Sequence, residues 1–152
     1  MKNLETDCSA EDEWEIEQEI AYYNSLPVIF DDFIDIPSLT DGEIELYCIA
    51  KKPAIPEKKW VPAYDFEIRR GGNRAGEINL RVGYTDGLYY GGQIGYCVEE
   101  ECRGHGYAGK ACRLLVPVIS AHKMKKILIN LQQALLMIGF LRLFLGMFIL
   151  IY

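Results

Sequence analysis

The stretch Ile94-Gly-Tyr-Cys-Val-Glu-Glu-Glu-Cys-Arg-Gly-His-Gly-Tyr-Ala-Gly-Lys-Ala111 decides the fold. Its first part alternates apolar and small residues, which predicts a strand over Gln93–Val98. A charged run ends that pattern. Gly104 and Gly106 then predict a tight turn whose bare backbone a ligand can approach closely.

Beyond the turn, the residues predict one helix over Tyr107–His122. One face of this helix carries Ala108, Ala111, Leu115 and Ile119. A helix that begins at a glycine-rich turn presents unpaired N–H groups and the positive end of its dipole, which favours an anion such as phosphate. The chain has no P-loop motif. The G-x-G-x-x-G at Gly104–Gly109 comes late and lacks the acidic residue that a dinucleotide site needs about 20 positions further on.

The motif Arg103-Gly104-His105-Gly106-Tyr107-Ala108 fits the Gln/Arg-x-x-Gly-x-Gly/Ala signature of the GCN5-related N-acetyltransferases. The preceding strand and the following helix and strand agree with it, and the resemblance covers roughly residues 41–130. It implies a mixed α/β fold, acetyl-CoA as co-substrate, no metal, and direct acetyl transfer to an amine of a small molecule or protein. The net basic remainder of the chain after residue 50 suits this phosphorylated cofactor.

The resemblance also implies site residues. In this family the fourth and fifth strands separate, so backbone groups of Tyr96, Cys97 and Val98 would bind the pantetheine arm. The pyrophosphate would bind the amides of Arg103, Gly104, His105, Gly106, Tyr107 and Ala108. Glu99 follows the fourth strand directly and would take the amine's proton through water.

The resemblance ends at Asn130, and the apolar tail 131–152 carries one charge, Arg142. Three interpretations stay open: a degenerate completion of the core, a membrane segment, or a shifted reading frame, which the abrupt change favours. Loss of the family's usual ending would leave the strand Lys126–Asn130 without an outer neighbour and promote self-association, for instance as a homo-oligomer. The alternative function is therefore a CoA-binding domain with little or no turnover.

The composition is that of one globular domain of 152 residues, with an acidic segment 1–42, a family-like core 43–130 and the tail. A net charge of −6 argues against nucleic acid as a partner. The acidic first part either attracts a cationic amine or forms a solvated helix face.

The five cysteines have no paired spacing and suggest neither a zinc site nor disulfides. The N-terminus is polar and shows no secretory signal, which makes the cytoplasm the default location.

The remaining elements follow from periodicity and turn residues. A helix is expected over Glu11–Ser25, with Trp14, Ile16, Ile20, Tyr22 and Tyr23 as its buried side. Pro27–Pro37 is a loop or a short helix covering the site. Strands are expected at Glu43–Ala50, Ala63–Arg70, Ala75–Tyr84 and Lys126–Asn130, with turns at Gly71–Asn73 and Thr85–Gly87. Leu88–Gly92 either lines a substrate pocket or forms a hairpin with exposed aromatic residues. The result is an antiparallel meander followed by a strand–helix–strand crossover.

Overall fold

The computed structural model describes residues 10–129 and, as backbone alone, residues 148–151. The strands are β1 (Leu39–Thr40), β2 (Glu45–Lys52), β3 (Ala63–Arg70), β4 (Asn73–Arg81), β5 (Ile94–Val98), β6 (Lys126–Ile129) and β7 (Phe148–Ile151). The helices are α1 (Ala10–Asn24), α2 (Asp86–Gly91), α3 (Tyr107–Leu114) and α4 (Val116–Ala121), with the 3₁₀ turns η1 (Pro56–Lys58) and η2 (Glu100–Cys102).

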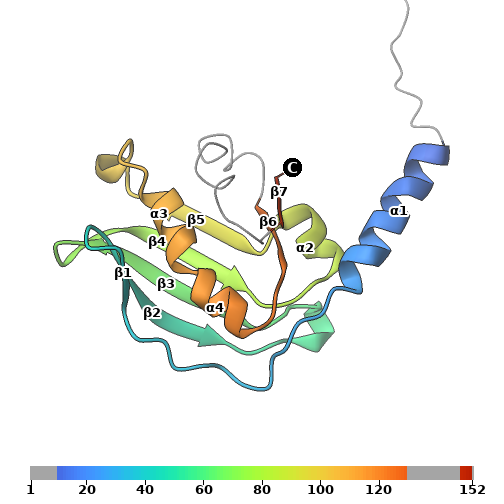
Figure 1. Ribbon diagram of the computed structural model, residues 1–152, viewed down its shortest axis with the longest axis horizontal. Helices are drawn as coiled ribbons and strands as arrows, with labels where there is room; N and C mark the ends of the chain where they lie inside the picture. The colour runs from blue at the N-terminus through green and yellow to red at the C-terminus, as the bar shows by residue number, and fades with distance from the viewer. Residues whose placement is uncertain (1–9, 130–147, 152) are drawn as a thin grey trace, which may run out of the picture.

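The strands of the described residues form one sheet in the order β1 to β7 (Figure 1). Each strand from β1 to β4 pairs antiparallel with the next, whereas β6 is parallel to β5 and β7 is parallel to β6. Helices α3 and α4 form the connection from β5 to β6. The predicted α/β class, with an antiparallel meander followed by a crossover, is therefore confirmed.

Two apolar clusters cover opposite faces of the sheet. The larger cluster includes Ile78 and Leu80 of β4 and lies under α3 and α4. In β6, Leu128 belongs to a second cluster with Tyr23, Leu88 and Tyr89, while its two neighbours belong to the first. Because successive side chains of a strand point to opposite faces, α2 and the end of α1 must lie on the face opposite α3 and α4.

The predicted strands are confirmed to within a few residues, and β3 has the predicted bounds. The expectation that β6 lacks an outer neighbour is wrong, because Phe148–Ile151 pairs with Lys126–Ile129 along its whole length. The rest of the tail, 130–147 and Tyr152, lies outside the described residues. Within the described part of the chain, no helix has the length and apolar character to cross a membrane.

Two helical predictions need correction. The chain predicted as a single helix over Tyr107–His122 forms two helices, α3 and α4, that meet at Leu115. Pro117 has no N–H to donate to the Arg113 carbonyl, so the helical hydrogen bonding is interrupted there. The predicted turn at Thr85–Gly87 instead starts α2: the Thr85 hydroxyl caps the helix by accepting from the Leu88 N–H at 3.2 Å. Leu88 and Tyr89 are then buried, and Tyr90 is exposed.

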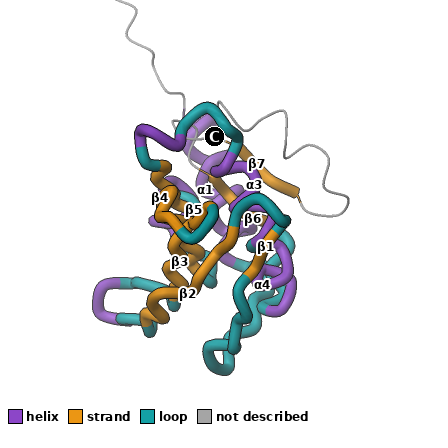
Figure 2. Tube along the Cα trace, turned by 90° about the vertical axis from the view of Figure 1, so that its left-hand side faces the viewer, coloured by secondary structure: helices purple, strands orange, loops and turns teal. Residues whose placement is uncertain are grey.

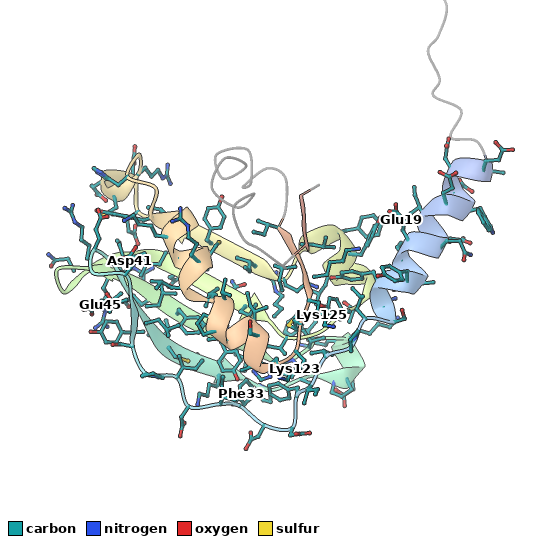
Figure 3. All side chains as sticks on the ribbon, viewed as in Figure 1. Glu19, Phe33, Asp41, Glu45, Lys123 and Lys125 are labelled. Carbon is teal, nitrogen blue, oxygen red and sulfur yellow. The ribbon has the colours of Figure 1, made fainter. Side chains whose placement is uncertain are left out.

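Helix α1 is confirmed, but its expected buried side is not. Trp14, Ile16 and Tyr22 are exposed, and Tyr23 is buried. The reason is visible in Figure 3, where α1 projects from the body and only its C-terminal part approaches the sheet. Near that end, Glu19 accepts a hydrogen bond from the Tyr89 hydroxyl at 2.6 Å.

The segment Pro27–Pro37 is a loop that docks beside α4 through a buried hydrogen-bonded network. His122 is 2% exposed, and its Nδ1 donates to the Ile29 carbonyl at 2.9 Å. Its Nε2 forms a hydrogen bond of 2.8 Å with the Tyr64 hydroxyl. That hydroxyl also accepts from the Ile34 N–H at 3.0 Å. The loop is thus held on the α3 and α4 side of the sheet.

Gly76 of β4 permits the close approach of β5, because a Cβ there would overlap the Cys97 carbonyl oxygen. Gly76→Ala should therefore lower the free energy of unfolding by about 2 kcal/mol or more, measured by urea denaturation. Gly91→Ala is the matched control, since nothing lies within 4 Å of its added Cβ. The control should be neutral or stabilising by up to about 1 kcal/mol. Equal stability of the two variants would contradict the assigned packing.

Candidate functional site

The glycine-rich turn connects the end of β5 to the start of α3 (Figure 1). Gly104 and Gly106 have φ of 83° and 75°, in the left-handed region that favours glycine. Gly106 is the N-cap of α3, and no side chain caps this helix start. Lys110 makes the first helical hydrogen bond, to the Gly106 carbonyl at 3.1 Å. The N–H groups of Tyr107, Ala108 and Gly109 therefore point out of the helix start.

The space beside the turn is open among the described residues. A Cβ built at Gly104 or Gly106 would meet nothing within 4 Å. The backbone conformation, rather than crowding, thus requires glycine at these positions. Tyr107 is buried in the core and stacks on the exposed His105, with ring centroids 5.4 Å apart. This stacking fixes the entry of the chain into α3, and the turn remains accessible from outside.

Arg103 folds back onto the strand that precedes it. Its Nε donates a hydrogen bond to the Val98 carbonyl at 3.0 Å. The side chain is exposed, so the guanidinium lies at the junction of β5 and the turn with further N–H groups to offer. A positive charge at this position adds to the positive end of the α3 dipole.

The backbone of β5 alternates between its two neighbours. The Glu99 N–H donates to the Ala75 carbonyl at 2.8 Å, and the Cys97 carbonyl faces Gly76, so both residues turn toward β4. By the same alternation, Tyr96 and Val98 turn their backbone groups toward the β6 side. Pairing of β5 with β6 in the described residues is confined to Ile94 and Ile129. Tyr96 and Val98 thus turn their backbone groups toward the side on which pantetheine is expected. Cys97, the third expected residue, turns its carbonyl toward β4 instead.

Glu99, the predicted base, is engaged with Arg74 of β4. Its Oε1 accepts from the Arg74 Nε at 2.9 Å, and Arg74 also pairs with Glu77 at 2.9 Å. The hydrogen bonds from Arg74 to Glu99 and Glu77 raise the pKa of the guanidinium above its ordinary value. The Glu99 carboxylate is therefore directed toward β4. It must exchange or share this contact with Arg74 to take up a proton.

Two side chains near β5, Cys112 and Tyr96, have pKa values above their ordinary range. Burial raises the pKa of Cys112 to about 12, so its thiol stays protonated at neutral pH. Burial, and to a lesser extent the nearby Cys112, raises the pKa of Tyr96. Cys97 is exposed. We find no group of side chains in residues 10–129 that would hold a metal ion.

Lys110 anchors α3 to the turn before β2. It pairs with Glu43 and, at 3.5 Å, with Asp41, which Figure 3 places at that end of the sheet. Partial burial alone would raise the pKa of Asp41. The N–H groups of Ile44 and Glu43, each 2.9 Å from its Oδ1, and Lys110 outweigh burial and lower that pKa. Asp41 therefore stabilises the fold above pH of about 4, and this contribution is lost as the pH falls through the lowered pKa.

Gln93 joins β5 to β6, and sequence reasoning did not identify it. The residue is fully buried, and its backbone N–H donates to the Leu128 carbonyl at 2.9 Å. Its side-chain Oε1 accepts from the Leu128 N–H at 2.8 Å, and its Nε2 donates to the Gly83 carbonyl at 3.1 Å and to the Tyr23 hydroxyl. One amide thus connects both strands to α1. The only signal for this role in the sequence is that a glutamine follows Gly91 and Gly92 and directly precedes an apolar strand.

Comparison of the chain with protein-family models, curated proteins and solved structures found no match.

Gln93→Leu should lower the free energy of unfolding by about 2–4 kcal/mol, because it leaves buried partners of the amide unsatisfied at about 1–3 kcal/mol each. Gln18→Leu on the exposed part of α1 makes the same chemical change without a buried hydrogen bond and should stay within about 0.5 kcal/mol. Urea denaturation of both variants measures the difference. A small effect of Gln93→Leu would remove the amide from its structural role.

Proposed function

We propose that this protein is an acetyl-CoA-dependent N-acetyltransferase with a fold like that of the GCN5-related family. The single observation that carries the proposal is the turn Arg103–Gly106. It holds two positive-φ glycines and opens a helix that no side chain caps. The motif resemblance supplies the identity of the anion as the pyrophosphate of CoA.

The pyrophosphate binds the N–H groups at the start of α3, where partial positive charge gathers and no side chain competes. Arg103 lies beside this position and adds a full positive charge, held in place by the Val98 carbonyl. The pantetheine arm runs back along the β6 side of β5, toward which Val98 turns its N–H. The thioester then lies near the middle of the sheet.

Transfer proceeds by attack of the amine nitrogen on the thioester carbonyl carbon. The C–N bond forms, the C–S bond breaks, the thiolate of CoA leaves, and the amine loses a proton. The protein contributes positioning, a backbone N–H for the developing oxyanion, and a base. Glu99 takes the proton through a water molecule.

A second candidate is a CoA-binding domain with little or no turnover. The observation in its favour is the hydrogen bond between Arg74 and Glu99, which occupies the only base that we assign. Both candidates predict acetyl-CoA binding. They differ in thiol release, which an assay with a panel of amines and free-thiol detection measures directly.

Gly106→Val tests the cofactor site. The side chain places bulk where phosphate would approach the helix start, and calorimetric titration should give at least a tenfold lower acetyl-CoA affinity. Gly72→Val is the matched control, since Gly72 has φ of 81° and also has open space around it. Both variants lose about 1–2 kcal/mol of stability from the left-handed conformation. Equal acetyl-CoA affinity in the two variants would refute this placement.

Glu99→Gln tests the base. In the transferase, kcat/KM should fall by about 100-fold, with the largest loss at low pH, where the amine is most protonated. Glu77→Gln removes the other carboxylate that pairs with Arg74 at 2.9 Å and should leave the pH–rate profile unchanged. An unaltered profile for Glu99→Gln, or equal losses in both variants, would exclude Glu99 as the base.

A further inference from the structure

A cavity of about 1200 Å³ lies between α2 and the loop that joins β2 to β3. Asn79 and Arg81 form part of its wall, and they alternate along β4 with the core residues Ile78 and Leu80. The cavity is therefore on the face opposite α3 and α4. Figure 2 shows the β2–β3 loop, with its short helical turn, projecting from the sheet on the side away from α4. This position is separate from the turn Arg103–Gly106.

Backbone contacts hold the loop in place. Ile55 and Trp60 form a bridge, with hydrogen bonds of 2.9 and 3.1 Å in the two directions. The Val82 N–H donates to the Pro62 carbonyl at 2.8 Å. Val61 fills the space beside Gly83, where its Cγ1 lies 2.7 Å from the position of an added Cβ. The cavity is thus preformed, as ligand pockets usually are.

An aromatic wall is the first recognition element. Most of the cavity's exposed lining is apolar, and Trp60 contributes to it while remaining 59% exposed. The Ile55–Trp60 bridge fixes the backbone of this tryptophan, and the Lys58 Nζ lies 4.6 Å from its ring centroid. An exposed indole fixed beside apolar surface suits a planar ring.

Positive charge is the second element. The lining contains Lys52, Lys58, Lys59 and Arg81 against the carboxylates of Asp65 and Asp86. Both carboxylates have partners, since Asp65 pairs with Lys52 and Asp86 accepts from the Asn24 amide at 2.5 Å.

Within residues 10–129, the other cations of the lining have no carboxylate partner. Lys58, Lys59 and Arg81 make no ion pair within residues 10–129. Arg81 uses Nη1 to donate to the Gly92 carbonyl at 3.0 Å and keeps other N–H groups. The cavity therefore offers cations without a counter-ion beside an aromatic surface.

We propose that this cavity binds a small aromatic carboxylate, with its ring against Trp60 and its carboxylate among Lys58, Lys59 and Arg81. The planar guanidinium suits two parallel hydrogen bonds to the carboxylate oxygens. The proposal does not depend on the acetyl-CoA site, and its ligand belongs to a different chemical class.

The experiment uses the full chain with Trp14→Phe, which removes the other of its two tryptophans and leaves Trp60 as the reporter. Benzoate, benzyl alcohol and benzylamine present the same ring with negative, zero and positive charge. Benzoate should change the Trp60 fluorescence saturably with a Kd of about 1 mM or below, at least tenfold tighter than either other probe. Equal binding of the three probes, or no saturable change up to about 10 mM, would overturn the proposal.

Charge variants in the same background locate the carboxylate. Lys59→Gln and Arg81→Gln should each weaken benzoate binding by about fivefold or more, since one charge-assisted hydrogen bond is lost. Lys51→Gln is the control, because Lys51 is on the neighbouring strand end but outside the cavity lining. Arg81→Lys should restore part of the affinity. Benzoate binding that is unchanged in Lys59→Gln and Arg81→Gln would refute the assigned site.

Discussion

The buried amide of Gln93 is the interaction on which the arrangement of the sheet depends. With its backbone N–H, it satisfies both the N–H and the carbonyl of Leu128, and its remaining donors reach Gly83 and the Tyr23 hydroxyl. A buried polar group without a partner costs about 1–3 kcal/mol, so these bonds select one position for β6 against β5. The same amide holds the end of α1 over the second apolar cluster.

From this junction the two ends of β5 take different roles. At its start, β5 is joined to β6, α1 and the loop before α2. At its end, Arg103 caps the last carbonyl, and two glycines turn the chain into α3 without a side-chain cap. Rigid packing at one end of β5 thus positions an open helix start at the other. Lys110 and Asp41 fix α3 from the opposite side, next to β2.

Local patterns predicted the parts of this protein that depend on nearby residues. β3 alternates buried and half-buried residues between Pro62 and Gly71, and its predicted bounds match the structure. The turn before α3 was visible from Gly104 and Gly106. In contrast, Gln93 with Leu128 and Arg74 with Glu99 join residues 35 and 25 positions apart, and no pattern in one sequence connects them. At α2, Gly87 and Gly91 favour a turn, whereas the Thr85 cap favours the helix that forms.

The most direct test of the central claim is a map of backbone amide shifts by ¹H–¹⁵N spectroscopy as acetyl-CoA is added. If the cofactor binds where β5 turns into α3, the largest shifts should fall on Gly104 to Gly109 and on Val98. Amides around Trp60 and Arg81, on the other face, should stay unchanged. Shifts centred on that face, or no saturable shift at the start of α3, would contradict the proposed site.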